Sequence, residues 1–296
     1  MSIIEKAAGK LGKDEKSRVI KVSEGESKMP VTDVGVVLGE SITAHGELGA
    51  QKAVSALSHV EINLAKLRQM GGITPNEEKT QIVEEFRIIK RPLITNAFKL
   101  GIGQANSGNL IMVTSALAGE GKSFTSINLA ISIAMEMDHT VLLVDADVAR
   151  PSLPKYLGVS NDAGLMDVLL DNTLDLADVI HRTNIEKLTL LTAGRKSQHS
   201  TELLASQGMS ALLKEVAQRY KDRIIIFDSP PLLLTSESRV LASQMGQIVL
   251  VVEAETTTQK TVLEALRQIE ACDNVNLIFN KARTYPGGDY YGYYYS

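Results

Sequence analysis

The sequence predicts an α/β fold: a doubly wound, mostly parallel sheet flanked by helices. Apolar runs without polar alternation, such as LIMV, VLLV and IIIF, are typical of strands buried on both faces of a parallel sheet. These runs alternate with segments of helical periodicity, as right-handed crossovers between parallel strands require. The runs begin only near residue 109, so the α/β domain occupies the later part of the 296-residue chain.

Each predicted element follows from its own pattern. Strands are predicted where apolar runs stand between polar or glycine-rich segments: 109–115, 140–146, 186–192, 223–228, 247–254 and 275–280. Helices are predicted between them, at 121–137, 163–171, 202–220, 236–244 and 257–271. Upstream, a helix is expected over 48–70, where Gly71, Gly72 and Pro75 end it, and a charged helix over 77–91, which Pro92 bends or restarts.

The chain divides into four predicted parts. A mobile N-terminal arm (1–47) precedes a helical segment with an assembly helix (48–100), the α/β domain (101–283) and a tyrosine-rich tail (284–296). The arm is rich in Lys, Glu, Ser and Gly and lacks sustained periodicity. A solvated arm is the simpler interpretation, and weak attraction to an anionic surface is the alternative.

Composition restricts the possible partners and compartment. Thirty-one Lys and Arg residues against 35 Asp and Glu give a net charge of −4, so no nucleic-acid partner is expected. The one cysteine, Cys272, excludes an intramolecular disulfide and favours a reducing, cytoplasmic location. No uninterrupted apolar stretch reaches the roughly 18 residues of a membrane span. Any membrane role is therefore expected to need a partner.

A phosphate-binding loop follows the first predicted strand. Residues 115–123 read SALAGEGKS, which matches the motif Gly-x4-Gly-Lys-Ser/Thr with Ala116 in place of the first glycine. Small residues before a helix let backbone N–H groups converge on a phosphate. Lys122 is expected to bridge the β- and γ-phosphates, and the Ser123 hydroxyl to ligate Mg²⁺. The sequence thus predicts a P-loop NTPase fold with ATP and Mg²⁺; an ordinary Gly-rich turn is the alternative.

Polar side chains end three further strands. Asp145 and Asp147 close the second strand, and Asp228 closes the fourth, before two prolines. Parallel strands end at one edge, so these carboxylates should meet the phosphate loop, with Asp147 and Asp228 as Mg²⁺ ligands beside Ser123. One Mg²⁺ ligand plus a helix-capping Asp is the alternative.

Asn280 ends the last strand and either reads the adenine base or forms a turn. The predicted nucleotide contacts are Ala118, Gly119, Glu120, Gly121, Lys122, Ser123, Phe124 and Asn280.

Six of the eight tyrosines lie in the last 12 residues, where a core cannot explain them. They are Tyr285, Tyr290, Tyr291, Tyr293, Tyr294 and Tyr295. Glycines and a proline among them prevent regular structure. The tail leaves the sheet at the nucleotide edge and spans at most about 50 Å, enough to enter a neighbouring subunit's site. A sticky aromatic terminus is the alternative.

Together these motifs resemble the bacterial tyrosine kinases of polysaccharide synthesis (BY-kinases). The loop, the D-x-D and D-S-P-P strand ends and the tyrosine cluster occur in the family's order across about residues 77–296. The sequence is most similar to the stand-alone cytoplasmic form, in particular to exosortase-associated tyrosine autokinases. The family's assembly helix E-x-x-R-x-x-R is matched by Glu84, Arg87 and Lys90, spacings expected to place three charges along one side of a helix.

The resemblance implies an ATP-dependent protein-tyrosine autokinase that phosphorylates its C-terminal cluster in trans and regulates exopolysaccharide polymerisation or export. It implies a ring-like homo-oligomer, recruitment to the inner face of the membrane by the cytoplasmic tail of a transmembrane chain-length regulator, and a cognate tyrosine phosphatase. The implied catalytic residues are Lys122, Asp145 and Asp147, with Asp145 accepting or orienting the phenol proton. The sequence departs from the family pattern at three positions. Ala118 stands where the family usually has Pro, and Lys90 stands where it has the last Arg of the assembly helix. The Arg that the family places two residues after the D-x-D motif is found one position later, at Arg150.

Two other functions fit parts of the pattern. A partitioning or septum-positioning ATPase shares both acidic strand ends, but it has a second lysine early in the loop, where Leu117 stands, and lacks the tyrosine cluster. The second alternative is a non-catalytic ATP-binding adaptor of the polysaccharide machinery. The loop lysine, the loop serine and all three carboxylates are present here, which argues against it because an adaptor does not need all five.

Overall fold

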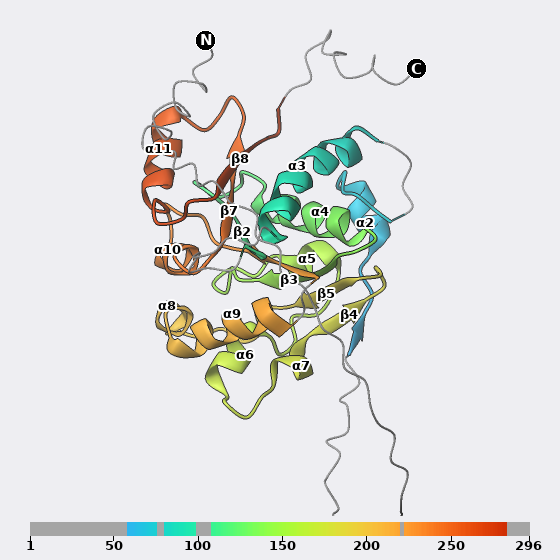
Figure 1. Cartoon of the computed structure of the whole chain (residues 1–296), viewed down its shortest axis with the longest axis vertical. Helices are drawn as coiled ribbons and strands as arrows, with labels where there is room; N and C mark the ends of the chain where they lie inside the picture. The colour runs from blue at the N-terminus through green and yellow to red at the C-terminus, as the bar shows by residue number, and fades with distance from the viewer. Residues whose placement is uncertain (1–57, 76–79, 99–107, 220–221, 283–296) are drawn as a thin grey trace, which may run out of the picture. The chain divides into compact units, whose positions relative to one another are not determined.

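The computed structural model describes residues 58–75, 80–98, 108–219 and 222–282 (Figure 1). The predicted arm (1–47) and the tail with its six tyrosines lie outside the described residues. The predicted division into four parts therefore stays a prediction. The α/β domain and the end of the preceding helical segment are described.

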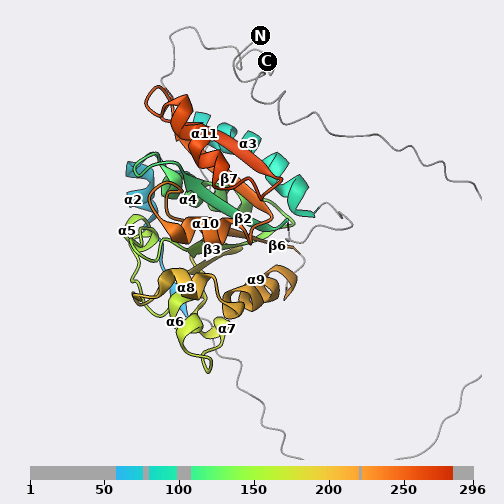
Figure 2. The ribbon, with the colours of Figure 1, turned by 90° about the vertical axis from the view of Figure 1, so that its left-hand side faces the viewer.

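One eight-stranded sheet organises the described chain and confirms the predicted fold class (Figures 1 and 2). Its strands are β1 (His59–Val60), β2 (Leu110–Ser115), β3 (Thr140–Asp145), β4 (His181–Thr183), β5 (Leu188–Leu191), β6 (Arg223–Asp228), β7 (Gln247–Glu253) and β8 (Val275–Asn280). The spatial order is β1-β4-β5-β3-β6-β2-β7-β8. Every neighbouring pair is parallel except the β4–β5 pair.

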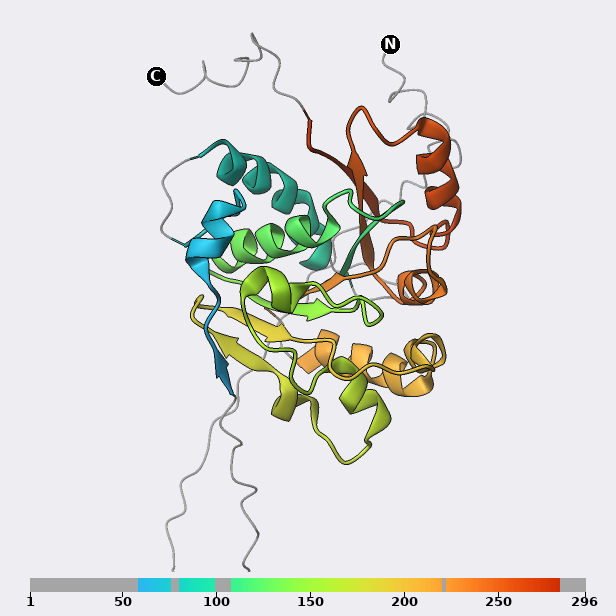
Figure 3. The ribbon, with the colours of Figure 1, turned by 180° about the vertical axis from the view of Figure 1, so that it is seen from behind.

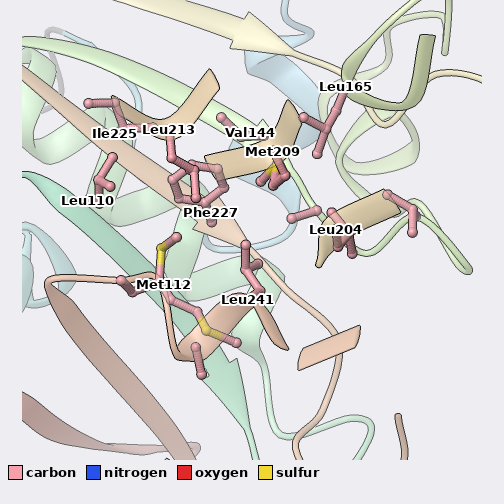
Figure 4. Packing of buried hydrophobic residues seen from close by; sticks show 14 of the residues in the cluster. Leu110, Met112, Val144, Leu165, Leu204, Met209, Leu213, Ile225, Phe227 and Leu241 are labelled. Carbon is pink, nitrogen blue, oxygen red and sulfur yellow. The ribbon is translucent and has the colours of Figure 1, made fainter. Parts of the chain in front are cut away.

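Helices cover both faces of the sheet (Figure 3). The helices are α2 (Leu64–Gln69), α3 (Gln81–Phe98), α4 (Lys122–Ala134), α5 (Leu153–Leu157), α6 (Leu165–Leu170), α7 (Leu176–Val179), α8 (Ser200–Leu204), α9 (Gln207–Arg219), α10 (Ser236–Ala242) and α11 (Gln259–Arg267). Helices α2 to α5 bury their apolar side chains on one face and α6 to α11 on the other. Alternate strand residues supply both cores: Met112 and Phe227 face α9 and α10 (Figure 4), whereas Ile111 faces α4.

Three elements differ from the sequence prediction because of contacts between distant segments. In the described part of the helix expected over 48–70, only Leu64–Gln69 is helical, since His59–Val60 pairs with β4 and the Ile62 N–H donates to Asn184 Oδ1 at 2.9 Å. The helix expected over 202–220 is divided into α8 and α9. The short strand β4, which the sequence did not predict, forms the antiparallel pair with β5.

Helix α3 runs through Pro92 without interruption, which corrects the expected restart, whereas the expected bend stays a prediction. A proline inside a helix removes the hydrogen bond to the carbonyl four residues earlier, here Ile88. Both Pro92 and Ile88 are exposed, so this carbonyl lies on the solvent side, where water can satisfy it. The free-energy cost of the missing hydrogen bond is therefore small, and the packing of Leu93 and its neighbours maintains the helix.

The charged residues of α3 do not share one exposed side. Glu84 and Arg87 form an exposed ion pair, but Lys90 is buried. Its ammonium donates to the Ser132 carbonyl at 2.6 Å and pairs with Glu136 Oε1 at 2.8 Å, both within this chain. The expectation that Lys90 lies with Glu84 and Arg87 on an assembly surface is therefore corrected: burial against α4 commits Lys90 to folding.

We expect Lys90→Met to lower the free energy of unfolding by about 2 kcal/mol, because the Ser132 carbonyl loses this donor and the Glu136 carboxylate keeps only the longer contact with Arg91 at 3.6 Å. Arg87→Met is the matched control on the same helix. Its exposed pair should contribute less than about 0.5 kcal/mol. Urea titration of both variants measures the difference, and equal losses would contradict the structural role of Lys90.

Candidate active site

The phosphate loop connects β2 to α4 in a conformation that requires glycine. Gly119 and Gly121 have φ angles of +91° and +98°, and Gly121 is the N-terminal cap of α4. A Cβ on Gly121 would lie 2.0 Å from Asn280 Nδ2. The backbone N–H groups of the first turn of α4 thus face the loop without a side chain in the way, as an anion site requires.

Glu120 fastens this loop to its surroundings through its side chain. The carboxylate is 2% exposed and accepts the Leu117 N–H at 2.6 Å, the Glu253 N–H at 3.4 Å and the Thr257 hydroxyl. The Glu120 carbonyl accepts Asn280 Nδ2 at 2.8 Å. The sequence predicted Glu120 and Asn280 as nucleotide contacts; the structure shows that both brace the loop against β7, β8 and the turn before α11. Their contacts with a nucleotide stay predictions.

Two buried carboxylates lie side by side where β3 and β6 end. Asp145 and Asp228 are register partners and fully buried. Asp145 Oδ2 accepts the N–H groups of Ser152 and Leu153, both at 3.0 Å, and Oδ1 accepts the Asp147 N–H at 3.2 Å. Asp145 therefore shapes the loop that follows its strand. Burial, together with the charge of Asp228, raises the pKa of Asp145 to about 8.

Lys122 provides the cation of the site. Its ammonium lies 2.9 Å from Asp147 Oδ2 and 4.0 Å from Asp228 Oδ1. Burial alone would lower the pKa of Lys122, but the negative charges of Asp228 and Asp147 outweigh it and raise that pKa. The lysine is therefore fully charged at neutral pH, as phosphate binding demands.

Ser152 belongs to the site although the sequence analysis did not select it. Its hydroxyl lies 2.7 Å from Ser123 Oγ and donates to Asp228 Oδ2 at 3.3 Å, while Ser126 donates to Asp228 Oδ1 at 3.1 Å. The sequence feature that could have identified Ser152 is its position directly after Arg150-Pro151, in the loop that follows the D-x-D strand end.

These hydroxyl and carboxylate oxygens are the hard ligands that Mg²⁺ prefers. Within the described ranges, no group of three His, Cys, Asp or Glu side chains forms a metal cage. The predicted Mg²⁺ ligands Ser123, Asp147 and Asp228 lie close to Lys122, and their role as ligands stays a prediction.

A cavity of about 590 Å³ opens beside the phosphate loop. Its lining residues are Ala118, Gly119, Gly121, Lys122, Ser123, Asp147, Ala149, Arg150, Ser152, Tyr156, Pro230, Pro231, Leu234 and Thr235. Asp147 and Lys122 therefore face the cavity, whereas Asp145, Asp228 and Phe124 do not line it.

Comparison with known proteins now decides the family. Residues 108–280 match the model of an AAA domain family. Over 234 residues the chain is 30% identical to the tyrosine-protein kinase YwqD of Bacillus subtilis (strain 168), covering 78% of this chain and 94% of that protein. The chain belongs to the bacterial tyrosine-protein kinases.

Two further comparisons place this tyrosine kinase among its relatives. The crystal structure of the VpsO kinase domain is 29% identical with a TM-score of 0.54, covering 69% of this chain and all of that domain. The tyrosine-protein kinase wzc of Salmonella typhi is 28% identical over 193 residues, which are 63% of this chain but 26% of that protein. The protein is thus a protein-tyrosine kinase, and some of its relatives are far longer.

We expect Glu120→Ala to weaken ADP binding about tenfold or more, because the Leu117 and Glu253 N–H groups lose their acceptor and the loop loses its fixed shape. Glu120→Gln keeps one acceptor oxygen and should lie between Ala and wild type. Titration with a fluorescent ADP analogue measures the affinities, and exposed Glu264→Ala on α11 serves as control. Wild-type affinity in Glu120→Ala would refute the bracing role.

We also expect the nucleotide-free protein to become less stable as the pH rises from about 4 to about 8, and the contribution of Asp145 to level off above that. The folded state retains a proton on Asp145 that the unfolded state has released, so raising the pH favours unfolding until the folded carboxyl also titrates. Urea unfolding at several pH values measures the slope. Asp145→Asn should flatten it; an unchanged slope in this variant would show that other groups cause the effect.

Proposed function

We propose that this tyrosine kinase is an ATP-dependent autokinase that phosphorylates its own C-terminal tyrosine cluster in trans, and thereby regulates exopolysaccharide polymerisation or export. One observation carries the proposal. Asn280, the last residue of β8, donates to the phosphate loop, and six tyrosines follow within 15 residues. The tail thus leaves the fold beside the nucleotide loop of a protein whose family phosphorylates tyrosine.

The described residues support a binding mode for ATP and Mg²⁺. The N–H groups at the start of α4 and the Lys122 ammonium would bind the phosphates, and Ser123, Asp147 and Asp228 would hold Mg²⁺. The bound ion supplies electrostatic stabilisation of the transferring phosphoryl group. In the transfer, the phenol oxygen bonds to the γ-phosphorus, the bond from that phosphorus to its bridging oxygen breaks with the electron pair on ADP, and the phenol proton passes to a carboxylate.

The cavity supports Asp147 more than Asp145 as that carboxylate. Asp147 lines the cavity, whereas Asp145 is fully buried and its oxygens already accept hydrogen bonds from three backbone N–H groups. Asp145 would reach a phenol only after residues 146–153 had moved. The sequence-based assignment of the proton to Asp145 stays a prediction. In our proposal Asp145 positions the loop and Asp147 meets the acceptor.

Assembly and membrane recruitment belong to the same proposal. On α3 the exposed Glu84–Arg87 pair is available to a neighbouring copy in a ring, whereas Lys90 is not. No helix in the described part of the chain is long and apolar enough to cross a membrane. We propose that the cytoplasmic tail of a transmembrane chain-length regulator recruits this kinase to the inner face of the membrane. A cognate tyrosine phosphatase would reverse the modification.

A mixing experiment tests the proposal. Two full-length variants are produced in the native host: Lys122→Met with its tail intact, and a chain with all six tail tyrosines changed to Phe. We expect neither variant alone to carry tail phosphotyrosine. After mixing with ATP and Mg²⁺, label should appear on the Lys122→Met chain, at a rate that rises with the concentration of its partner. Mass mapping assigns the modified tyrosines.

The other outcomes separate the alternatives. ATP hydrolysis by wild type without phosphotyrosine would indicate a partitioning-type ATPase. ATP binding with neither product would indicate an adaptor. Tail phosphotyrosine in wild type but none on Lys122→Met after mixing would show transfer within one chain and refute the trans mechanism.

A further inference from the structure

The cavity lies on one side of the phosphate loop only. In the sheet, β2 and its loop stand between β6 and β3 on one side and β7 and β8 on the other. Apart from the loop and the start of α4, the cavity is lined by the segments that follow β3 and β6. Among the described residues, none that follows β7 or β8 lines it. Asn280, the predicted adenine contact, lies on the opposite side, so a nucleotide reaching towards β8 would leave the cavity beyond its phosphates open.

The outer wall of this cavity is apolar and rigidly attached to the loop. Pro230, Pro231 and Leu234 supply it; the two prolines are buried, and Leu234, which is 59% exposed, presents the accessible apolar surface. Between them the Leu232 N–H donates to the Ser115 carbonyl at 2.8 Å, and the Leu233 N–H donates to the Ala116 carbonyl at 3.3 Å. These bonds fix the wall relative to the phosphate loop itself.

The wall faces charged groups in the same cavity. Asp147 and Lys122 lie at its inner end, and exposed Arg150 is also in the lining. An apolar surface that ends in a carboxylate and an ammonium suits a ligand with an apolar body and a polar tip. A tyrosine side chain is such a ligand, and burial of its ring supplies much of its binding energy. A serine hydroxyl lies too close to its own backbone to span the same wall.

We infer that Pro231 and Leu234 bind the phenol ring of the acceptor tyrosine, which comes from the C-terminal segment of a second copy of this chain. This inference rests on the proposed function. The ring packs on the wall with its hydroxyl towards Asp147 and Lys122. A second copy is the source that the proposed trans mechanism names, and the end of β8, where the chain's own tail begins, lies across the loop from the cavity. The segment's one charged residue, Asp289, complements Arg150, and its glycines permit a close approach of the backbone.

Leu234→Ser tests the wall without disturbing the core, because the side chain is exposed. The enzyme is the full-length chain with its six tail tyrosines changed to Phe, and the acceptor is a peptide of residues 284–296. We expect Leu234→Ser to raise the KM for the peptide about tenfold, the effect of losing the apolar contact with one ring. The kcat at saturating peptide and the affinity for ADP should stay within about twofold. Leu234→Met should restore the low KM.

Leu263→Ser is the matched control, since Leu263 on α11 is 49% exposed and lies outside the cavity. It should leave the KM unchanged. An unchanged KM in Leu234→Ser, or a KM increase shared by both variants, overturns the inference. The parent chain with its natural tail is run in the same assay. If it labels its tail while Leu234→Ser binds the peptide normally, only the wall is wrong; if neither tail nor peptide is labelled, the proposed function fails and the wall with it.

Discussion

The contact of the Lys122 ammonium with Asp147, just after β3, and with Asp228, at the end of β6, is the interaction on which the site depends. Parallel register brings Asp145 and Asp228 together in full burial, where desolvation and mutual repulsion oppose the charged form of each carboxyl group. Lys122, three backbone N–H groups and the Ser126 and Ser152 hydroxyls offset this cost. A triphosphate that draws Lys122 towards itself would leave the carboxylates uncompensated. In the proposed binding mode, a divalent cation held by Asp147 and Asp228 would restore the balance, which would give a physical reason for nucleotide and Mg²⁺ to bind together.

The sheet order then determines which side of the site is rigid and which is open. On the β7–β8 side, Glu120 and Asn280 connect the phosphate loop to two strands and to the turn before α11. On the β3–β6 side, the loop meets segments that line a cavity. A fixed loop beside an open cavity suits phosphoryl transfer, because the donor must stay in place while an acceptor enters and leaves.

The parts of the fold that the sequence predicted are those in which local pattern and tertiary role agree. Buried parallel strands are apolar throughout, and motif residues at their ends must meet at one edge, so Lys122, Asp145 and Asp228 were found correctly as neighbours. The prediction failed where a distant segment decides the outcome. Lys90 looks like an exposed helix charge until Glu136 on α4 is seen beside it. His59–Val60 lies in a segment with helical periodicity but forms a strand, because it pairs with β4. The predicted nucleotide contact of Glu120 stays a prediction, but its bracing role was missed because nothing local reveals that Thr257 lies against its carboxylate.

Leu117 bears on why this site would transfer phosphate to a phenol rather than to water. The partitioning ATPases that share both acidic strand ends place a lysine at this position. Here the Leu117 N–H is held by Glu120, and the side chain is exposed and apolar. Such a side chain cannot supply a second positive charge to a phosphate. Leu234, in the lining of the cavity, is apolar and exposed as well. In the proposed mechanism an aromatic ring that packs on this side chain would displace ordered water from the cavity, which would favour transfer to the phenol.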